Sequence, residues 1–315
     1  MEARIINPDP AYPPARLIEP TSLGYLLIAA EVHPRAIPLQ RVLPIPRDRW
    51  EALAAVYEAL PPLEQMDGVE RITVFDAIAI PPVRTPDDAQ HDGRQGAHFD
   101  VVIFMETESP DRARAVQRTP AYRVLMDTLS RHAKRVEAIA ARNARRIADV
   151  DATRPGLFLF NYFVASDVQV AVQLWDYLAG WYEAETGLDN STLLVPLEGE
   201  SSPYCAINHA RWDVGVFRLL WDQLSAKSFR TYVRANLEEN RVTAYPILYR
   251  LAPRVSMGIV PSRAASVAAA MAGAGLAWWG WRRLARARAR HGTSRIADVG
   301  QSSQIETHEP TLAAV

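Results

Sequence analysis

Three residues in one short segment carry side chains that can act on an organic molecule: Asn208, His209 and Trp212. Successive side chains of a strand point to opposite faces, so a strand here places Asn208 and Trp212 on one face and His209 on the other. An asparagine amide can orient a phenol or enolate oxygen, and an indole can stack on a flat ring. A neutral imidazole can accept a proton or bind haem iron. The alternative is structural: Asn208 satisfies a strand end and Trp212 packs in the core.

Two carboxylates form a second candidate, because Asp100 and Glu106 share one face of a predicted strand. A buried carboxylate is costly unless it is paired, so they predict either an acid–base group with a perturbed pKa or two solvated strand ends. The single cysteine, Cys205, excludes an internal disulfide and is expected to be an inert core residue. His98 and His132 lack metal-ligand spacing, and no glycine-rich phosphate loop, Gly-x-Ser-x-Gly or His-Glu-x-x-His motif occurs. We therefore predict no cofactor and no metal site.

The composition is that of an ordinary globular protein. The 315 residues are 49% hydrophobic and 23% charged, and this length is typical of about two domains. Lys and Arg number 35 against 36 Asp and Glu, which gives a formal net charge of −1. A nucleic-acid-binding domain carries a basic excess, so we predict no nucleic-acid partner.

Periodicity and turn signals predict the elements that must position these residues. In the first half, strands are predicted over 23–32, 71–80 and 99–107, and helices are predicted to begin near Asp48, at Pro110 and at Pro120. The last of these helices is predicted to continue through Val136 and Ile139, because both residues extend the helical spacing of Leu125 and Leu129. A fourth strand is not evident in this half, although residues 146–150 can supply a short one.

The second half repeats the same order of elements. Strands are predicted over 157–164, 191–197, 204–212 and 242–251, with helical regions over 168–182 and 213–239. This βαββαβ order is the ferredoxin-like motif, in which helices cover one face of a sheet. Both faces of the strand at 157–164 are apolar, so the uncovered sheet faces are expected to pack against each other. The predicted fold class is α+β, with two ferredoxin-like repeats (21–152 and 153–253) packed sheet to sheet as a pseudo-dimeric α+β barrel with an internal cleft; two independent α+β domains are the alternative.

Residues 204–251 carry a family resemblance. In this stretch a predicted strand ending in NHARWD leads into a helix and then into ANLEENRVTAYPILYRL. This stretch resembles the second half of an antibiotic-biosynthesis-monooxygenase-type domain. Residues 20–252 as a whole resemble the dimeric α+β barrel superfamily in its tandem single-chain form. The resemblance implies cofactor-free oxidation of polycyclic phenols, haem degradation, or haem-dependent chlorite or peroxide chemistry. It also implies roles for Asn208 and Trp212, since oxygenase-like members use an asparagine and a tryptophan near the end of the third strand.

The two ends of the chain differ from its body. Residues 1–20 are proline-rich and lack the apolar region of a secretory signal, which predicts an extended arm and a cytoplasmic location. Residues 264–281 are uncharged and carry three tryptophans next to an arginine cluster. The stretch 262–291 therefore predicts an Ala-rich helix that spans or lies on a membrane, with 264–290 as the contact, or else a soluble helix with a basic end. Residues 292–315 are predicted to be a disordered tail.

Three functions follow from these features. The first is a membrane-associated, non-catalytic binding or scaffold module whose ligand is unknown. The second is a cofactor-independent, monooxygenase-like enzyme in which Asn208, Trp212 and His209 position a flat aromatic substrate in the cleft between the repeats. The third and lesser alternative is haem-linked chemistry through a histidine. The oligomeric state is not predicted.

Overall fold

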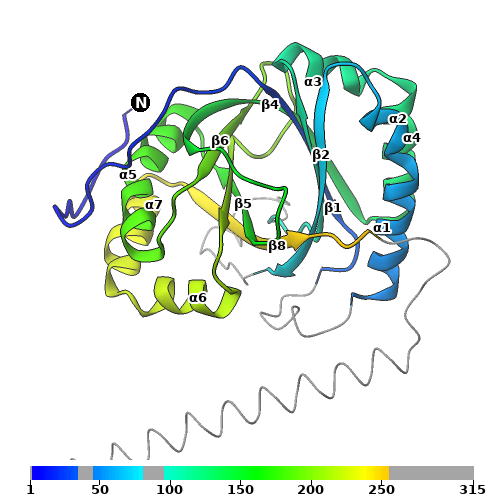
Figure 1. The fold of residues 1–315 in the computed structure, drawn as a ribbon. Helices are drawn as coiled ribbons and strands as arrows, with labels where there is room; N and C mark the ends of the chain where they lie inside the picture. The colour runs from blue at the N-terminus through cyan, green and yellow to red at the C-terminus, as the bar shows by residue number, and fades with distance from the viewer. Residues whose placement is uncertain (1, 35–44, 81–95, 255–315) are drawn as a thin grey trace, which may run out of the picture. The chain divides into compact units, whose positions relative to one another are not determined.

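The computed structural model describes residues 2–34, 45–80 and 96–254, which form a closed eight-stranded barrel flanked by helices (Figure 1). The strands are β1 (Gly24–Glu31), β2 (Val69–Ala79), β3 (Val101–Thr107), β4 (Arg135–Ala148), β5 (Leu157–Val164), β6 (Ser191–Pro196), β7 (Ala206–Trp212) and β8 (Thr243–Leu251). The helices are α1 (Arg47–Ala59), α2 (Pro61–Glu64), α3 (Pro110–Gln117), α4 (Pro120–His132), α5 (Val168–Thr186), α6 (Val216–Ser225), the π-helical η2 (Phe229–Arg234) and α7 (Ala235–Glu239). The predicted C-terminal helix (262–291) and tail (292–315) lie outside the described residues.

The strand order shows two equivalent repeats. Around the barrel the order is β1-β3-β2-β8-β5-β7-β6-β4, and every neighbouring pair is antiparallel. The first repeat contributes β4-β1-β3-β2 and the second contributes β8-β5-β7-β6, so both place their strands in the order fourth, first, third, second. This order agrees with tandem ferredoxin-like repeats and confirms the predicted α+β class.

The two sheets join at their edges as well as facing each other. Strand β2 pairs with β8 and strand β4 pairs with β6, so each sheet closes the other. A barrel of two sheets was predicted, and the pairing of the sheet edges adds to it that the eight strands form one continuous ring. Closure leaves no barrel strand with an unpaired edge, and it makes the two repeats one unit rather than two independent domains.

The prediction that the helix continues through Val136 and Ile139 is wrong, because both residues lie in strand β4. Helix α4 ends at His132, and the chain then runs as a 14-residue strand from Arg135 to Ala148. The backbone of this segment pairs with β1 on one side and β6 on the other. Alanine and arginine favour helices locally, but this long-range pairing decides the conformation. β4 is the fourth strand of the first repeat, and its end overlaps the short strand predicted over 146–150.

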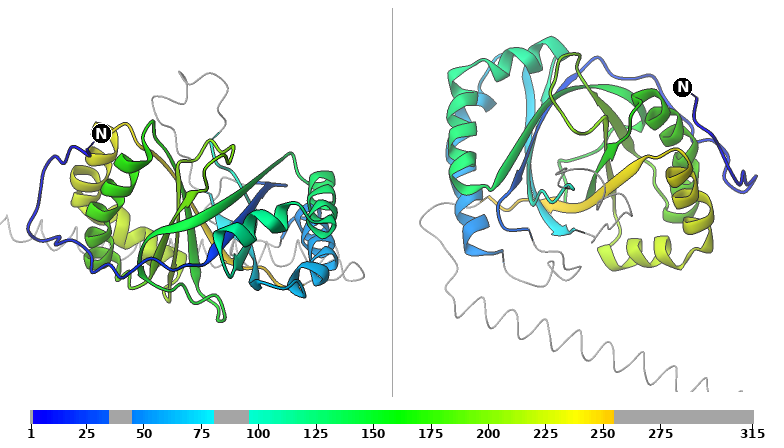
Figure 2. Two further views of the ribbon diagram at one scale, coloured as in Figure 1. Left: turned by 90° about the horizontal axis from the view of Figure 1, so that it is seen from above. Right: turned by 180° about the vertical axis from the view of Figure 1, so that it is seen from behind.

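Side chains alternate between the barrel interior and an exterior covered by two groups of helices (Figure 2). On the outside, α1, α3 and α4 cover the first repeat, and α5 with the α6–α7 region covers the second. The interior is filled by a cluster rich in aromatic rings, which includes Phe75, Phe158, Phe160, Tyr162 and Tyr249. The predicted internal cleft is therefore not continuous, because these rings occupy the middle of the barrel.

The N-terminal residues form an extended arm over the helices of the second repeat (Figure 1). Backbone N–H groups of Arg4 and Ile6 donate to the side-chain oxygens of Asn240 and Asn236, at 2.7 and 2.8 Å. Further along, a Cβ at Gly180 on α5 would collide with the carbonyl oxygen of Pro13. Glycine is needed at this position so that the arm can lie directly on the helix.

Candidate functional site

A pocket of about 360 Å³ opens at the end of the barrel where β1 and β2 begin and β3 and β4 end. Its walls include side chains of both repeats: Tyr25, Arg71, Phe104, Glu106, Arg146 and His209. The volume is near the lower end of the range for small-molecule sites. Aromatic walls with a few polar groups around them are also typical of such sites. We take this mouth pocket as the candidate functional site.

His209 lines the mouth pocket and, of Asn208, His209 and Trp212, is the one that does. Its ring Nδ1 lies 3.1 Å from the carbonyl oxygen of Leu159. A carbonyl oxygen can only accept, so Nδ1 carries the proton and Nε2 holds a lone pair. Among the described residues none forms a hydrogen bond with Nε2. Burial lowers the pKa of His209 to about 3, so the ring is neutral at neutral pH.

Aromatic rings surround the His209 imidazole. Phe160 stacks on it with a centroid distance of 4.2 Å and an interplanar angle of 13°, and the Phe104 centroid lies 5.1 Å away. Tyr25 stacks on Phe104 at 5.5 Å and 21°, and both residues line the pocket. A flat ligand can therefore stack against aromatic faces while it reaches the imidazole.

The pocket is chemically asymmetric although the fold is nearly symmetric. Leu27 pairs with Phe104 in the β1–β3 ladder, and Phe160 pairs with His209 at the equivalent step of the β5–β7 ladder. His209 thus occupies in the second repeat the position that Phe104 occupies in the first. Only the second repeat supplies an imidazole at this step, so the barrel offers a single such group at its mouth.

Two ion pairs lie at the rim of the pocket. Arg71 on β2 is hydrogen-bonded to Glu106 on β3, and Arg146 on β4 is hydrogen-bonded to Asp149. The Arg71 side chain is 40% exposed and Glu106 is 15% exposed, so water reaches this rim. Arg71 also contributes to the lowered pKa of His209, because a nearby cation disfavours a charged imidazole.

The structure places Asn208 and Trp212 away from His209. Both side chains lie on the outer face of β7, where Trp212 packs among the residues beneath α5. Trp212 Nε1 donates to the Thr186 hydroxyl at 3.2 Å, and the Ser191 hydroxyl donates to Asn208 Oδ1 at 2.6 Å. The expectation that these two side chains share the inter-repeat pocket with His209 is therefore corrected. A catalytic role for either of them stays a prediction.

The two carboxylates are also separated, at opposite ends of β3. Glu106 faces the mouth pocket, whereas Asp100 precedes the strand and accepts hydrogen bonds from the backbone N–H groups of Val32 and His33, both at 2.7 Å. Burial raises the pKa of Asp100. Arg49 lies 3.7 Å from its Oδ2 atom. Asp100 therefore belongs to a buried polar cluster at the other end of the barrel and not to an acid–base pair with Glu106.

The remaining predicted residues lie outside the mouth pocket. Cys205 is half-buried, its thiol donates to the Phe163 carbonyl at 3.4 Å, and burial raises its pKa. His98 is exposed, and His132 is at the end of α4. Over 2–34, 45–80 and 96–254, no cluster of three or more His, Cys, Asp or Glu side chains can hold a metal ion. Haem binding through His209 stays a prediction; the ring lines the mouth pocket and is 3% exposed.

Sequence reasoning missed Tyr25, Phe104, Arg71 and Arg146 as pocket residues. Alternation along each strand could have placed the first three on the interior face. It could not have placed Arg146, because β4 has a register shift between Asn143 and Arg145 that changes which face its residues occupy.

Comparisons with known proteins support the fold. No family model and no curated protein matches the chain. A solved structure described as an anthrone oxidase-like protein has a TM-score of 0.51 and 11% identity, over 75% of this chain and 96% of that one. A putative monooxygenase from Lactobacillus acidophilus NCFM matches with a TM-score of 0.40 and 10% identity, over 75% and 99% of the two chains. A mutant chlorite dismutase from Candidatus Nitrospira defluvii matches with a TM-score of 0.41 and 11% identity, over 75% of this chain and 94% of that one.

The protein has the dimeric α+β barrel fold, built here from two repeats of one chain. At these identities the likeness shows the fold alone. Within the part of the chain that the structure describes, none of the helices is both long enough and apolar enough to cross a membrane.

Proposed function

We propose that the mouth pocket binds a small, flat, hydroxylated aromatic molecule whose hydroxyl group donates a hydrogen bond to Nε2 of His209. The observation that carries this proposal is the 3.1 Å contact between His209 Nδ1 and the Leu159 carbonyl oxygen, from which we infer that Nδ1 carries the proton. Nε2 is then an acceptor held in a wall of aromatic rings. An acceptor that lines the pocket and has no partner among the described residues favours a ligand that can donate, and the rings favour a flat one.

The low pKa of His209 favours binding without proton transfer. A phenol has a pKa of about 10, so transfer to a group with a pKa of about 3 costs roughly 10 kcal/mol. An imidazolium–phenolate pair about 4 Å apart recovers only about 4 kcal/mol at an effective dielectric constant of about 20. The neutral hydrogen-bonded pair is therefore the more stable state, which supports a binding module over a base catalyst.

Naphthol and its methyl ether test this proposal. Both molecules are flat, but only naphthol can donate to Nε2, and one such hydrogen bond is worth about 1 kcal/mol, or about fivefold in Kd. A fluorescence titration is expected to show this preference in the wild-type protein. His209→Asn keeps a donor for the Leu159 carbonyl but removes the Nε2 acceptor, so the preference is expected to disappear. Equal affinity for both compounds in the wild-type protein contradicts the proposal.

The second candidate is a cofactor-independent, monooxygenase-like enzyme. It is supported by the fold shared with a protein described as anthrone oxidase-like and by the presence of a neutral imidazole in the pocket. In this case His209 accepts a proton from the methylene group of an enolisable aromatic substrate. Dioxygen then converts that methylene group to a carbonyl, with release of one water molecule. Oxygen uptake with anthrone as the probe measures this activity. Uptake that His209→Asn abolishes supports the enzyme, and uptake equal to that of buffer alone rejects it.

Membrane association through residues 264–290, with the barrel on the cytoplasmic side, is also retained as a proposal. It is supported by the uncharged stretch 264–281 and the arginines that follow it. The full chain is expected to sediment with anionic vesicles, and a chain ending at residue 260 is expected to stay in the supernatant. Equal partitioning of the two chains contradicts the proposal.

A further inference from the structure

The arginine-rich run 142–146 of β4 is divided between two pockets on opposite faces of the barrel. Arginine-rich runs of this kind are typical of solvated helix faces, but this segment is a strand with register shifts between Asn143 and Arg145 and again after Arg146. Arg146 lines the mouth pocket, whereas Arg142 and Arg145 line a second pocket on the outer face. Regular alternation would place Arg142 and Arg146 on one face, and the bulge between them shifts the alternation by one residue, so they lie on opposite faces.

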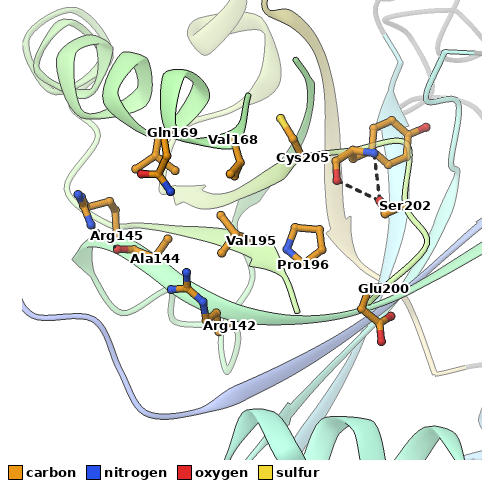
Figure 3. Close-up of a pocket in the computed structure, with 12 residues that line it drawn as sticks. Arg142, Ala144, Arg145, Val168, Gln169, Val195, Pro196, Glu200, Ser202 and Cys205 are labelled. Atoms are coloured by element: carbon orange, nitrogen blue, oxygen red, sulfur yellow. Dashed lines mark hydrogen bonds between the residues drawn. The ribbon is translucent and has the colours of Figure 1, made fainter. Parts of the chain in front are cut away.

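The outer pocket has a volume of about 350 Å³ and lies where the two repeats meet. Its floor is formed by β4 of the first repeat and β6 of the second, and one wall is the first turn of α5 (Figure 3). The segment 200–205, which leads into β7, closes the other side. The second pocket is therefore a built cavity on the seam between repeats, on the opposite side of the β4–β6 sheet from His209.

Two polar side chains of the outer pocket are available to a ligand. The Arg142 guanidinium is exposed and forms no hydrogen bond or ion pair with any residue that the structure describes. The side-chain amide of Gln169 is likewise exposed and has no side-chain partner within the described ranges. Figure 3 shows both groups directed into the pocket from opposite walls. Arg145 contributes less, because its Nε donates to Asp176 at 3.0 Å and its Nη1 to the Ala144 carbonyl at 2.9 Å.

The other polar side chains of the outer pocket that Figure 3 labels each have at least one partner. Glu200 Oε2 accepts from the backbone N–H of Ala140 at 3.0 Å and from Gln117 Nε2 at 3.4 Å. Figure 3 shows the Glu200 carboxylate directed away from Arg142. Ser202 Oγ bonds to both the N–H and the carbonyl of Tyr204, each at 3.0 Å. Of the charged side chains that line the outer pocket, Arg142 is the one without a partner among the described residues, which favours an anionic ligand.

The rest of the lining sets the shape and character of that ligand. Val168, Val172, Val195 and Pro196 form an apolar wall beside the two donors. A free phosphate ion would leave this wall uncovered, whereas a carboxylate with a short alkyl chain covers it and still reaches the guanidinium. We propose that the outer pocket is a binding site for a small carboxylate that carries a short apolar chain, with Arg142 and Gln169 holding its carboxylate. This site is independent of the proposed function of the mouth pocket.

The only cysteine of the sequence supplies a local reporter, because Cys205 also lines the outer pocket. Hexanoate is the probe, and its neutral analogue hexanamide is the matched control ligand. The full chain is treated with N-ethylmaleimide, a neutral reagent, and the single adduct is followed by intact mass spectrometry, with each variant compared with its own rate in the absence of ligand. Bound hexanoate is expected to slow alkylation of Cys205, and the concentration dependence gives its Kd.

Arg142→Gln is the test variant, and Arg123→Gln, at an exposed position on α4, is the control. Loss of the charge-assisted hydrogen bond is expected to raise the Kd for hexanoate about tenfold in Arg142→Gln, equivalent to about 1.4 kcal/mol. The control variant is expected to keep the wild-type Kd, and hexanamide is expected to protect the thiol much less than hexanoate does. The proposal is overturned if hexanoate gives no protection in the millimolar range. Equal protection by hexanamide, or an unchanged Kd in Arg142→Gln, overturns it as well.

Discussion

Replacement of His209 by asparagine removes a buried titrating group while it keeps a hydrogen-bond donor for the Leu159 carbonyl. In the unfolded chain a histidine has a pKa of about 6.5, whereas burial lowers the pKa of His209 to about 3 in the folded protein. Between these two values the unfolded chain binds a proton that the folded barrel does not. The free energy of unfolding therefore falls as the pH falls below about 6.5, by about 1.4 kcal/mol per unit, until about pH 3.

From about pH 7 to about pH 5 the His209 contribution amounts to about 2 kcal/mol. Urea denaturation at these two pH values measures the free energy of unfolding of the wild-type protein and the variant. His209→Asn is less stable at neutral pH because the ring leaves a cavity, but its stability is expected to fall by about 2 kcal/mol less over this interval.

His98→Asn is the matched control for this experiment. It makes the same replacement at an exposed ring whose Nδ1 also lies 3.1 Å from a carbonyl oxygen, that of Gly96. Because the His98 ring is exposed, this variant separates the effect of burial from the effect of replacing a histidine. Parallel profiles for the wild-type protein and His209→Asn would refute the conclusion that the imidazole is held neutral inside the barrel.

Three further substitutions test other parts of the structure. Trp212→Phe removes a hydrogen bond on the outer face of β7, so it is expected to lower the free energy of unfolding, measured by urea denaturation, by about 1–2 kcal/mol and to leave the Kd for naphthol unchanged. A higher Kd would indicate that Trp212 contributes to the binding site. Asp76→Asn removes the buried charge whose Oδ1 lies 3.2 Å from Arg49 Nε, and is expected to lower stability by about 3 kcal/mol or more; a change below about 1 kcal/mol would show that this ion pair is dispensable. Gly180→Ala places a methyl group against the Pro13 carbonyl and is expected to release the N-terminal arm, which limited proteolysis detects as faster cleavage; unchanged cleavage would contradict the close approach.

The sequence was sufficient to predict most of the barrel because its strands and caps carry local signals. The strand 157–164 was predicted with its observed bounds, since it is apolar on both faces and lies between turn signals. The helix starts at Pro110 and Pro120 were also confirmed, because Ser109 and Thr119 cap them and proline suits the first turn. Such features depend on residues that are close together in the chain.

The features that the sequence did not predict depend on long-range pairing. β4 has a helical composition, and only its pairing with β1 and β6 makes it a strand. The edge-to-edge closure of the two sheets likewise depends on strands far apart in sequence, such as β2 and β8.

For the candidate site, alternation placed His209 opposite Asn208 and Trp212 correctly, but it did not show which face is the interior. That choice depends on which side the helices cover, and helix α5 covers the side that carries Trp212. The family pattern of an asparagine and a tryptophan favoured the outer face, whereas the mouth pocket is on the face of His209.

The most direct test of the binding site is ¹⁵N NMR of the His209 imidazole in the full-length protein, recorded with and without naphthol. The geometry predicts a neutral ring protonated on Nδ1, with an Nε2 resonance that shifts when naphthol is added and does not shift with the methyl ether. A ring protonated on Nε2, or an Nε2 resonance that naphthol leaves unchanged, would contradict the assignment of His209 as the acceptor for a bound hydroxyl group.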